Sequence, residues 1–153
     1  MNIDKITLER INTAHPKIRT ALLEQYKEVS ALLPCNVTLR FAYVYRSPEE
    51  QAKLFTQRPK VTNANAWQSI HQYGTAFDIV LIIDNKASWN VGKEWKMIAE
   101  YFKSKGWEYG GDWAKFKDYP HFQMSFGYTW QQMKAKIDKK DYKIENGIKY
   151  INL

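Results

Sequence analysis

Two histidines and one aspartate are the side chains of this chain best suited to hold a metal ion. His71 and Asp78 lie seven positions apart, and His121 follows much later in the sequence. The chain has only one other histidine, His15, which precedes a proline and suits the start of a helix. Two imidazoles and one carboxylate can hold zinc with one coordination position open, which is typical of a catalytic site and not of a structural one.

Nearby charged residues could complete the chemistry of such a site. Zinc lowers the pKa of its bound water to about 7, and the carboxylate of Asp118, three residues before His121, could take the proton and pass it to a leaving amine. Asp112 is a second candidate for this base, although a carboxylate after two glycines also suits a turn. Arg46 could offer two parallel donors to a substrate carboxylate or a developing oxyanion; its alternative role is a surface salt bridge.

The position of Asp78 in the sequence is itself an argument for a metal. The run from Ala76 to Ile83 is apolar except for this aspartate, which predicts a central strand buried on both faces. A lone carboxylate there is costly unless its charge is compensated, and a metal ion would do so. The alternative is that Asp78 lies at a strand end and caps a turn. Residues 121–124 are expected to form a short strand that places His121 beside Asp78.

Periodicity and turn residues predict the elements around this site. Ser47-Pro48 predicts a helix start after the strand, with Ser47 as the cap, and Asn146-Gly147 predicts a C-terminal hairpin. Alternating or helical spacing of apolar residues predicts the other elements: helices over 15–33, 91–105 and 129–140, and a strand over 37–44. We therefore expect an α+β fold in a single domain, residues 1–153, with a small central antiparallel sheet flanked by helices, the zinc site at the sheet, and a C-terminal β-hairpin.

Composition narrows the class of protein. The chain has 153 residues, 44% of them hydrophobic and 25% charged, as in ordinary globular domains. The net charge of +7 would attract nucleic acid, an anionic membrane surface or an anionic wall polymer, and does not choose among them. The single cysteine, Cys35, excludes an internal disulfide and a cysteine-based zinc finger. No signal peptide or membrane-spanning run is evident, so we expect synthesis in the cytoplasm, no membrane insertion, and action on an outside target after release.

Three sequence motifs resemble a known enzyme family. Ser-x-His-x-x-Gly-x-Ala-x-Asp over 69–78, Gly-Gly-Asp-Trp over 110–113 and Asp-x-Pro-His-Phe over 118–122 are similar to the zinc D-alanyl-D-alanine carboxypeptidase and L-alanyl-D-glutamate endopeptidase family. These peptidases cut bacterial peptidoglycan peptides, and many phage endolysins belong to the group. The Tyr-Arg-Ser segment over 45–47 resembles the family's substrate-binding segment, but the glycine that often precedes it is absent.

The resemblance implies a role for each matching residue. The implied residues are the zinc ligands His71, Asp78 and His121, the general base Asp118, and the substrate-binding residues Arg46, Ser47, Gln51 and Ser69. The motifs look more like those of the endopeptidase branch, which implies hydrolysis of the L-alanyl-D-glutamate bond by a phage or prophage endolysin.

The expected partner is the peptidoglycan stem peptide and not nucleic acid, and a monomer is expected. Two alternatives remain open at this point. One is hydrolysis of the D-alanyl-D-alanine bond at the same site, as a carboxypeptidase or dipeptidase. The other is a non-catalytic module that binds cell wall or nucleic acid through its lysines and aromatic rings.

Overall fold

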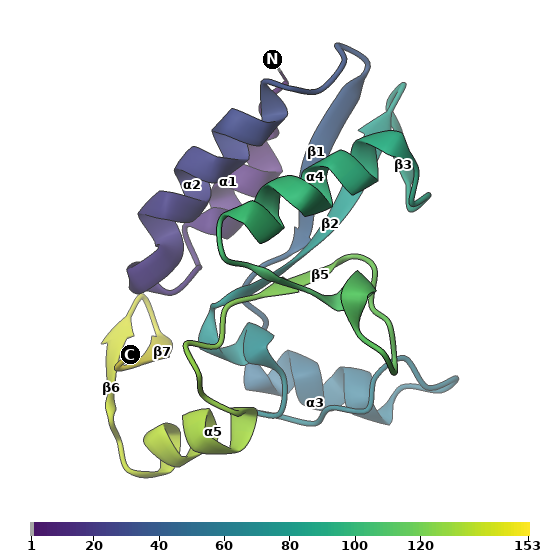
Figure 1. Cartoon of the computed structure of the whole chain (residues 1–153). Helices are drawn as coiled ribbons and strands as arrows, with labels where there is room; N and C mark the ends of the chain where they lie inside the picture. The colour runs from purple at the N-terminus through teal and green to yellow at the C-terminus, as the bar shows by residue number, and fades with distance from the viewer. Residues whose placement is uncertain (1) are drawn as a thin grey trace.

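The computed structural model describes residues 2–153 and is organised around one antiparallel sheet (Figure 1). The spatial order is β1-β2-β5-β4, with β3 paired to β2. The strands are β1 Val37–Tyr43, β2 Ala76–Ile83, β3 Lys86–Ser88, β4 Glu108–Tyr109 and β5 His121–Gln123. The apolar run of Ala76–Ile83 therefore forms the central strand, as predicted from the sequence, because burial on both faces favours uninterrupted apolar residues.

The strand register places chemically active residues opposite one another. Asp78 on β2 pairs directly with His121 on β5. On the other side of β2, the register of β1 shifts between Phe41 and Tyr43, so that Tyr43 pairs with Asp78. Such a bulge bends a strand and redirects the residues that follow it, and here those residues lead to Arg46.

Three helices enclose the core on one side of the molecule: α1 Lys5–Ile11, α2 Pro16–Ser30 and α4 Lys93–Ser104 (Figure 1). The core between them is rich in aromatic residues, with Phe77 stacked between Phe41 and Phe122 at centroid distances of 4.4 and 5.0 Å. Helix α1 covers the free edge of β1, where Thr7 Oγ1 accepts a hydrogen bond from the Phe41 N–H. Covering an edge strand in this way prevents its pairing with another chain.

Two further helices lie at the other end of the molecule: α3 Pro48–Thr56 and α5 Trp130–Asp138 (Figure 1). Ser47 caps α3 by accepting a hydrogen bond from the Glu50 N–H, as its sequence predicts. The predicted helices are each shorter than expected, since their last residues form turns. Helix α1 and the short 3-10 helices η1 Ile70–Tyr73 and η2 Gly110–Asp112 were not predicted. None of the helices within residues 2–153 combines the length and apolar character needed to cross a membrane.

The predicted C-terminal hairpin is confirmed as β6 Tyr142–Glu145 and β7 Ile148–Ile151. Asn146 and Gly147 have φ angles of 51° and 77°, the left-handed conformation that a two-residue hairpin turn requires. The α+β fold with a central antiparallel sheet and a terminal hairpin is thus confirmed. No finding tests the prediction of a single domain over residues 1–153, which stays a prediction.

His15 joins the start of α2 to this hairpin. Its Nδ1 accepts a hydrogen bond from the Lys17 N–H at 3.0 Å, and its Nε2 lies 2.7 Å from the Ile151 carbonyl oxygen. A carbonyl only accepts, so Nε2 carries the proton and the ring is neutral. Burial lowers the pKa of His15, because the charged form would be desolvated. A second proton would also occupy the Nδ1 position that caps the helix.

We predict that His15 makes stability depend on pH. The pKa of this base is lowered by folding, so the unfolded chain takes up a proton first as the pH falls below about 6.5. The stabilisation is complete above that pH and declines toward acid. In urea denaturation, the difference in unfolding free energy between wild type and His15→Asn should narrow from about pH 7.5 to about pH 5.5. A difference that stays constant or widens over this pH range would contradict a lowered pKa of His15 in the folded protein.

Candidate functional site

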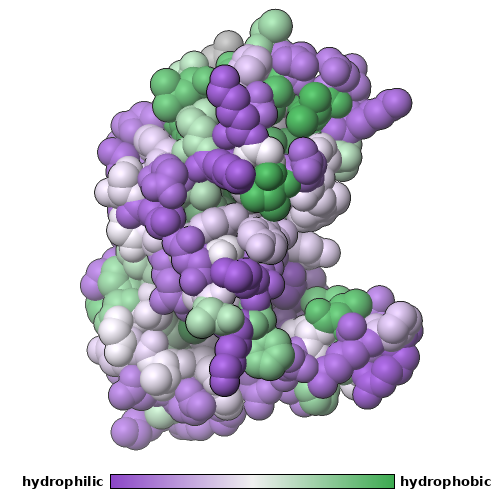
Figure 2. Space-filling view, turned by 45° about the vertical axis from the view of Figure 1, so that its right-hand side comes forward, coloured by the Kyte–Doolittle hydropathy of each residue, from purple (hydrophilic) through white to green (hydrophobic). Residues whose placement is uncertain are grey.

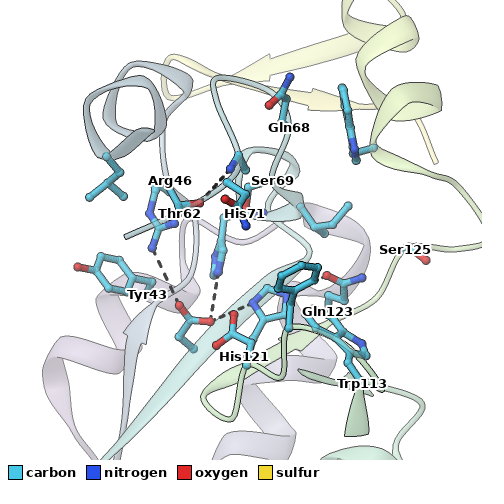
Figure 3. A pocket seen from close by; sticks show the side chains of 18 of the residues that line it. Tyr43, Arg46, Thr62, Gln68, Ser69, His71, Trp113, His121, Gln123 and Ser125 are labelled. Carbon is cyan, nitrogen blue, oxygen red and sulfur yellow. Dashed lines mark hydrogen bonds and ion pairs between the residues drawn. The ribbon is translucent and has the colours of Figure 1, made fainter. Parts of the chain in front are cut away.

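The fold brings His71, Asp78 and His121 into one cluster (Figure 3). Asp78 Oδ1 lies 3.0 Å from His121 Nδ1 and 3.3 Å from His71 Nε2. The three potential ligand atoms all lie within 4.8 Å of one another. His71 comes from η1, which leads directly into β2, so three separate segments of the chain converge on this point.

The proton positions on His71 follow from its surroundings. Its ring is buried, and Nδ1 lies 2.7 Å from the carbonyl oxygen of Val44. The carbonyl can only accept, so Nδ1 carries the hydrogen and Nε2 presents a lone pair toward Asp78. A hydrogen bond of this kind on the far nitrogen is how metal-binding histidines are usually oriented.

His121 is oriented by a chain of two further residues. Its Nε2 lies 2.8 Å from Gln123 Oε1, and Gln123 Nε2 donates to Glu108 Oε2 at 3.1 Å. The carboxylate of Glu108 accepts only, so it determines which end of the Gln123 amide faces the ring. His121 therefore donates through Nε2, and in the neutral ring the Nδ1 lone pair faces Asp78.

When both rings are neutral, two lone pairs and a carboxylate oxygen face one point, an arrangement that favours a positive charge there, either a bound cation or a proton on a ring nitrogen. Burial by itself would raise the pKa of Asp78, but the two imidazoles, His71 first, hold it well below its ordinary value. For His121, burial lowers the pKa and the Asp78 carboxylate more than offsets this, so the pKa is raised. A divalent cation would satisfy all three donors, and two nitrogens with one oxygen fit a zinc-type site.

Arg46 lies beside the cluster, with its Nη2 4.0 Å from Asp78 Oδ2 (Figure 3). Its guanidinium stacks over Tyr43 at 4.4 Å from the ring centroid and donates to Gln51 Oε1 at 3.1 Å. Its Nε is buried and has no hydrogen-bond partner within residues 2–153. Arg46 is therefore held in place from several sides, and its buried Nε is left unsatisfied. Tyr43 occupies the region where the resembling family often has glycine.

The structure places two of the expected substrate-binding residues, both neighbours of Arg46, away from the cleft surface. Gln51 is fully buried and does not line the cleft; it binds Arg46, and its Nε2 donates to the Ala64 carbonyl at 2.8 Å. The Ser47 hydroxyl caps α3 and also lies away from the cleft. Their contacts suit a positioning role, and substrate binding by Gln51 and Ser47 stays a prediction. Ser69 does line the cleft, and its hydroxyl accepts from the His71 N–H at 3.3 Å.

The cluster lies in an open cleft of about 1390 Å³. Figure 2 shows the surface hollowed between an upper and a lower part of the molecule. One wall is formed by α3 and the segment 61–64, and the facing wall by residues 113–118. The segment 125–131, which includes the start of α5, forms one end. The cluster is therefore accessible from a cleft that several separate segments of the chain line.

Asp118 lines this cleft, whereas the other candidate base does not. Partial desolvation, together with the charge of Asp78, raises the pKa of Asp118. Its N–H donates to the Gly110 carbonyl at 3.0 Å, and a side chain at Gly110 would collide with the Asp118 main chain. Asp112 instead binds Lys103 Nζ at 2.8 Å. Position thus favours Asp118 over Asp112 for chemistry in the cleft.

The sequence reasoning did not single out several residues that shape the site. Gln123 could have been found, because residues i and i+2 of a strand share a face and Gln123 follows His121 by two. Glu108 required knowledge that β4 pairs with β5. Val44 acts through its main-chain carbonyl, for which the residue type gives no signal.

Comparison with known proteins identifies the class. Residues 62–124 match the model of a family described as D-alanyl-D-alanine carboxypeptidase. The peptidoglycan L-alanyl-D-glutamate endopeptidase CwlK of Bacillus subtilis (strain 168) is 40% identical over 94 residues, which are 52% of this chain and 56% of CwlK. An L-alanyl-D-glutamate peptidase of Listeria phage A118 is 34% identical over 79 residues, 46% of this chain and 28% of that protein.

The matched region thus spans about half of CwlK and less of the phage protein. A crystal structure of the Serratia marcescens L-Ala D-Glu endopeptidase ChiX has the same fold. It aligns with a TM-score of 0.61 and 21% sequence identity, covering 82% of this chain and 91% of ChiX. The resemblance to peptidoglycan peptidases is confirmed, and the comparisons support a peptidase.

We predict that Gln51 stabilises the cleft through Arg46. Gln51→Leu should lower the free energy of unfolding by about 1–3 kcal/mol, because buried polar groups that bind the amide lose their partner. Gln57→Leu is the matched control: Gln57 is exposed on the cleft wall and should change stability by less than about 0.5 kcal/mol. Urea denaturation measures both. Equal changes in the free energy of unfolding for the two variants would show that the buried amide of Gln51 is not required for stability.

Proposed function

We propose that this chain is a zinc-dependent peptidase that hydrolyses the L-alanyl-D-glutamate bond of the peptidoglycan stem peptide. The match of residues 62–124 to the D-alanyl-D-alanine carboxypeptidase family supports a peptidase. The observation that carries the proposal is the convergence of two imidazole lone pairs and a carboxylate in an open cleft. The names of CwlK and the phage A118 relative support the choice of bond.

In this proposal His71, Asp78 and His121 hold the metal, which supplies Lewis acidity and activates water when bound. Asp118, on the cleft wall, takes the proton from the attacking water and delivers it to the leaving amine. Its raised pKa suits a group that both accepts and returns a proton. Arg46, which also lines the cleft, binds a substrate carboxylate or the developing oxyanion through its guanidinium.

The shape of the cleft supports an endopeptidase. Its lining residues continue past the cluster toward α3 on one side and toward the 125–131 segment on the other, so chain can extend both ways from the scissile bond. Hydrolysis of D-alanyl-D-alanine is the second candidate, since the matching family carries that description. Mass spectrometry of the released fragments distinguishes a new amino terminus on D-glutamate from free D-alanine.

A role as a phage or prophage endolysin is part of the proposal. The phage A118 relative supports it, and a net charge of +7 suits a wall polymer that carries carboxylates. The expected monomer, the absence of nucleic-acid binding and the action on the wall after release from the cytoplasm stay predictions.

We predict that zinc stabilises the protein through the three ligands. At about 100-fold excess over its dissociation constant, a ligand adds about 2.7 kcal/mol, which raises Tm by about 5–10 °C for a domain of this size. Calorimetry should show this shift in wild type and its reversal by a chelator. His71→Ala and Asp78→Ala should lose it, whereas the control His15→Asn should keep it. If zinc raised the Tm of both ligand variants as much as that of wild type, the assignment of these residues as metal ligands would be contradicted.

We predict that Asp118 is needed for hydrolysis but not for metal binding. Asp118→Asn preserves shape and removes the base, so kcat on purified peptidoglycan should fall by about 10²–10⁴-fold, while elemental analysis still finds one metal per chain. Asp112→Asn is the matched control and should remain active, because its carboxylate binds Lys103 away from the cleft. Wild-type activity in Asp118→Asn would remove Asp118 from the mechanism.

A further inference from the structure

One end of the cleft has a chemistry different from that of the rest. The charged side chains that line the cleft are Arg46, Asp78, Glu108, Lys117 and Asp118. The segment 125–131 contributes none of them and lines the cleft with Ser125, Tyr128, Thr129, Trp130 and Gln131. In a chain with a net charge of +7, an end lined by uncharged polar and aromatic groups is suited to a neutral ligand.

The aromatic side chains of this end are anchored from behind. Trp130 and Tyr128 are partly buried and pack against a small apolar cluster that includes Ile70, Met133 and Ile151. Both also line the cleft, so each ring is supported by the core while part of it stays accessible. A fixed and partly exposed indole offers a large apolar surface at a small entropic cost on binding.

Free hydrogen-bonding groups surround these rings. The side chains of Ser125 and Gln131 have no hydrogen-bond partner in the part of the chain that the structure describes. The Oε1 of Gln68 accepts a hydrogen bond from the Asn65 N–H at 2.8 Å, which leaves the amide NH₂ of Gln68 free to donate to a ligand. Gln68 is also a cleft residue (Figure 3). The hydroxyl of Thr129, in contrast, is occupied in capping α5.

We propose that this end of the cleft, which we call the α5 subsite (Gln68, Ser125, Tyr128, Trp130 and Gln131), binds a neutral N-acetylated sugar of the glycan strand. A sugar ring has an apolar C–H face that packs on an aromatic ring. Its hydroxyl and acetamido groups match amide and hydroxyl side chains. No lysine or arginine is among the lining residues of this subsite, and Lys136, whose Nζ lies 5.2 Å from the centroid of the Tyr128 ring, is paired with Asp141 at 3.0 Å. This disfavours a polyanion, which unpaired cationic side chains would have to neutralise.

The position of the subsite fits the chemistry of the substrate, and this step rests on the proposed function. In the stem peptide, L-alanine is joined to a muramic acid, so a single residue separates the scissile bond from the sugar. One residue spans about 3.5 Å, so the sugar has to lie close to the cluster. The carboxylate of D-glutamate lies on the other side of the bond, where Arg46 can bind it. The sugar then extends away from Arg46, toward α5.

A binding experiment tests the subsite without reference to catalysis. We predict that the neutral disaccharide N,N′-diacetylchitobiose, titrated into the protein and followed by heteronuclear NMR, shifts the resonances of residues 125–131 saturably. Trp130→Ala should weaken binding by about tenfold, the equivalent of about 1.4 kcal/mol. Trp89→Ala is the matched control, since Trp89 is 55% exposed and lies outside the cleft. No saturable shift, or equal affinity in Trp130→Ala, would overturn the proposal.

A kinetic experiment tests whether the subsite serves the substrate. Two substrates are compared, a disaccharide-linked stem peptide and the same peptide freed of sugar. Wild type should prefer the linked form in kcat/KM, and Gln131→Ala and Trp130→Phe should reduce that preference. Gln131 is exposed, so its substitution does not threaten folding. An equal loss on both substrates would contradict a sugar subsite. Failure of wild type to cut either one would instead contradict the proposed function and leave the binding result to decide.

Discussion

The carboxylate of Asp78, held between the imidazoles of His71 and His121, is the interaction on which the rest of the structure depends. Both rings donate their far N–H to other groups, so in the neutral rings the nitrogens that face Asp78 present lone pairs. Three electron-rich atoms at contact distance repel one another unless a positive charge lies between them. The sheet nevertheless holds them there, because Asp78 and His121 are register partners in adjacent strands.

The surrounding elements hold this arrangement in place. The Val44 carbonyl directs His71, and the chain from Glu108 through Gln123 directs His121. These partners are positioned by three separate strands or strand ends, so the cluster can form only when the whole sheet has formed. The same sheet leaves one side open to a cleft whose charged residues gather near the cluster and whose α5 end is uncharged. Such a division suits a substrate with one charged and one neutral side.

Much of this could be predicted from the sequence, and the failures have physical causes. The run over 76–83 predicted the central strand because it is apolar apart from a single aspartate. Asn146-Gly147 predicted the hairpin because few residues other than these adopt positive φ readily. The burial of Gln51 could not be predicted, since a motif does not show which face of α3 is buried. The role of Val44 could not be predicted, because a main-chain carbonyl depends only on where the strand ends.

The most direct test of the central claim is a crystal structure of the protein with zinc, with anomalous data collected at the zinc edge. The account predicts one strong peak at about 2.0–2.2 Å from His71 Nε2, His121 Nδ1 and a carboxylate oxygen of Asp78. It also predicts an open position that faces the cleft and Asp118. A peak at other residues, or no peak between these three in a fully folded protein, would contradict it.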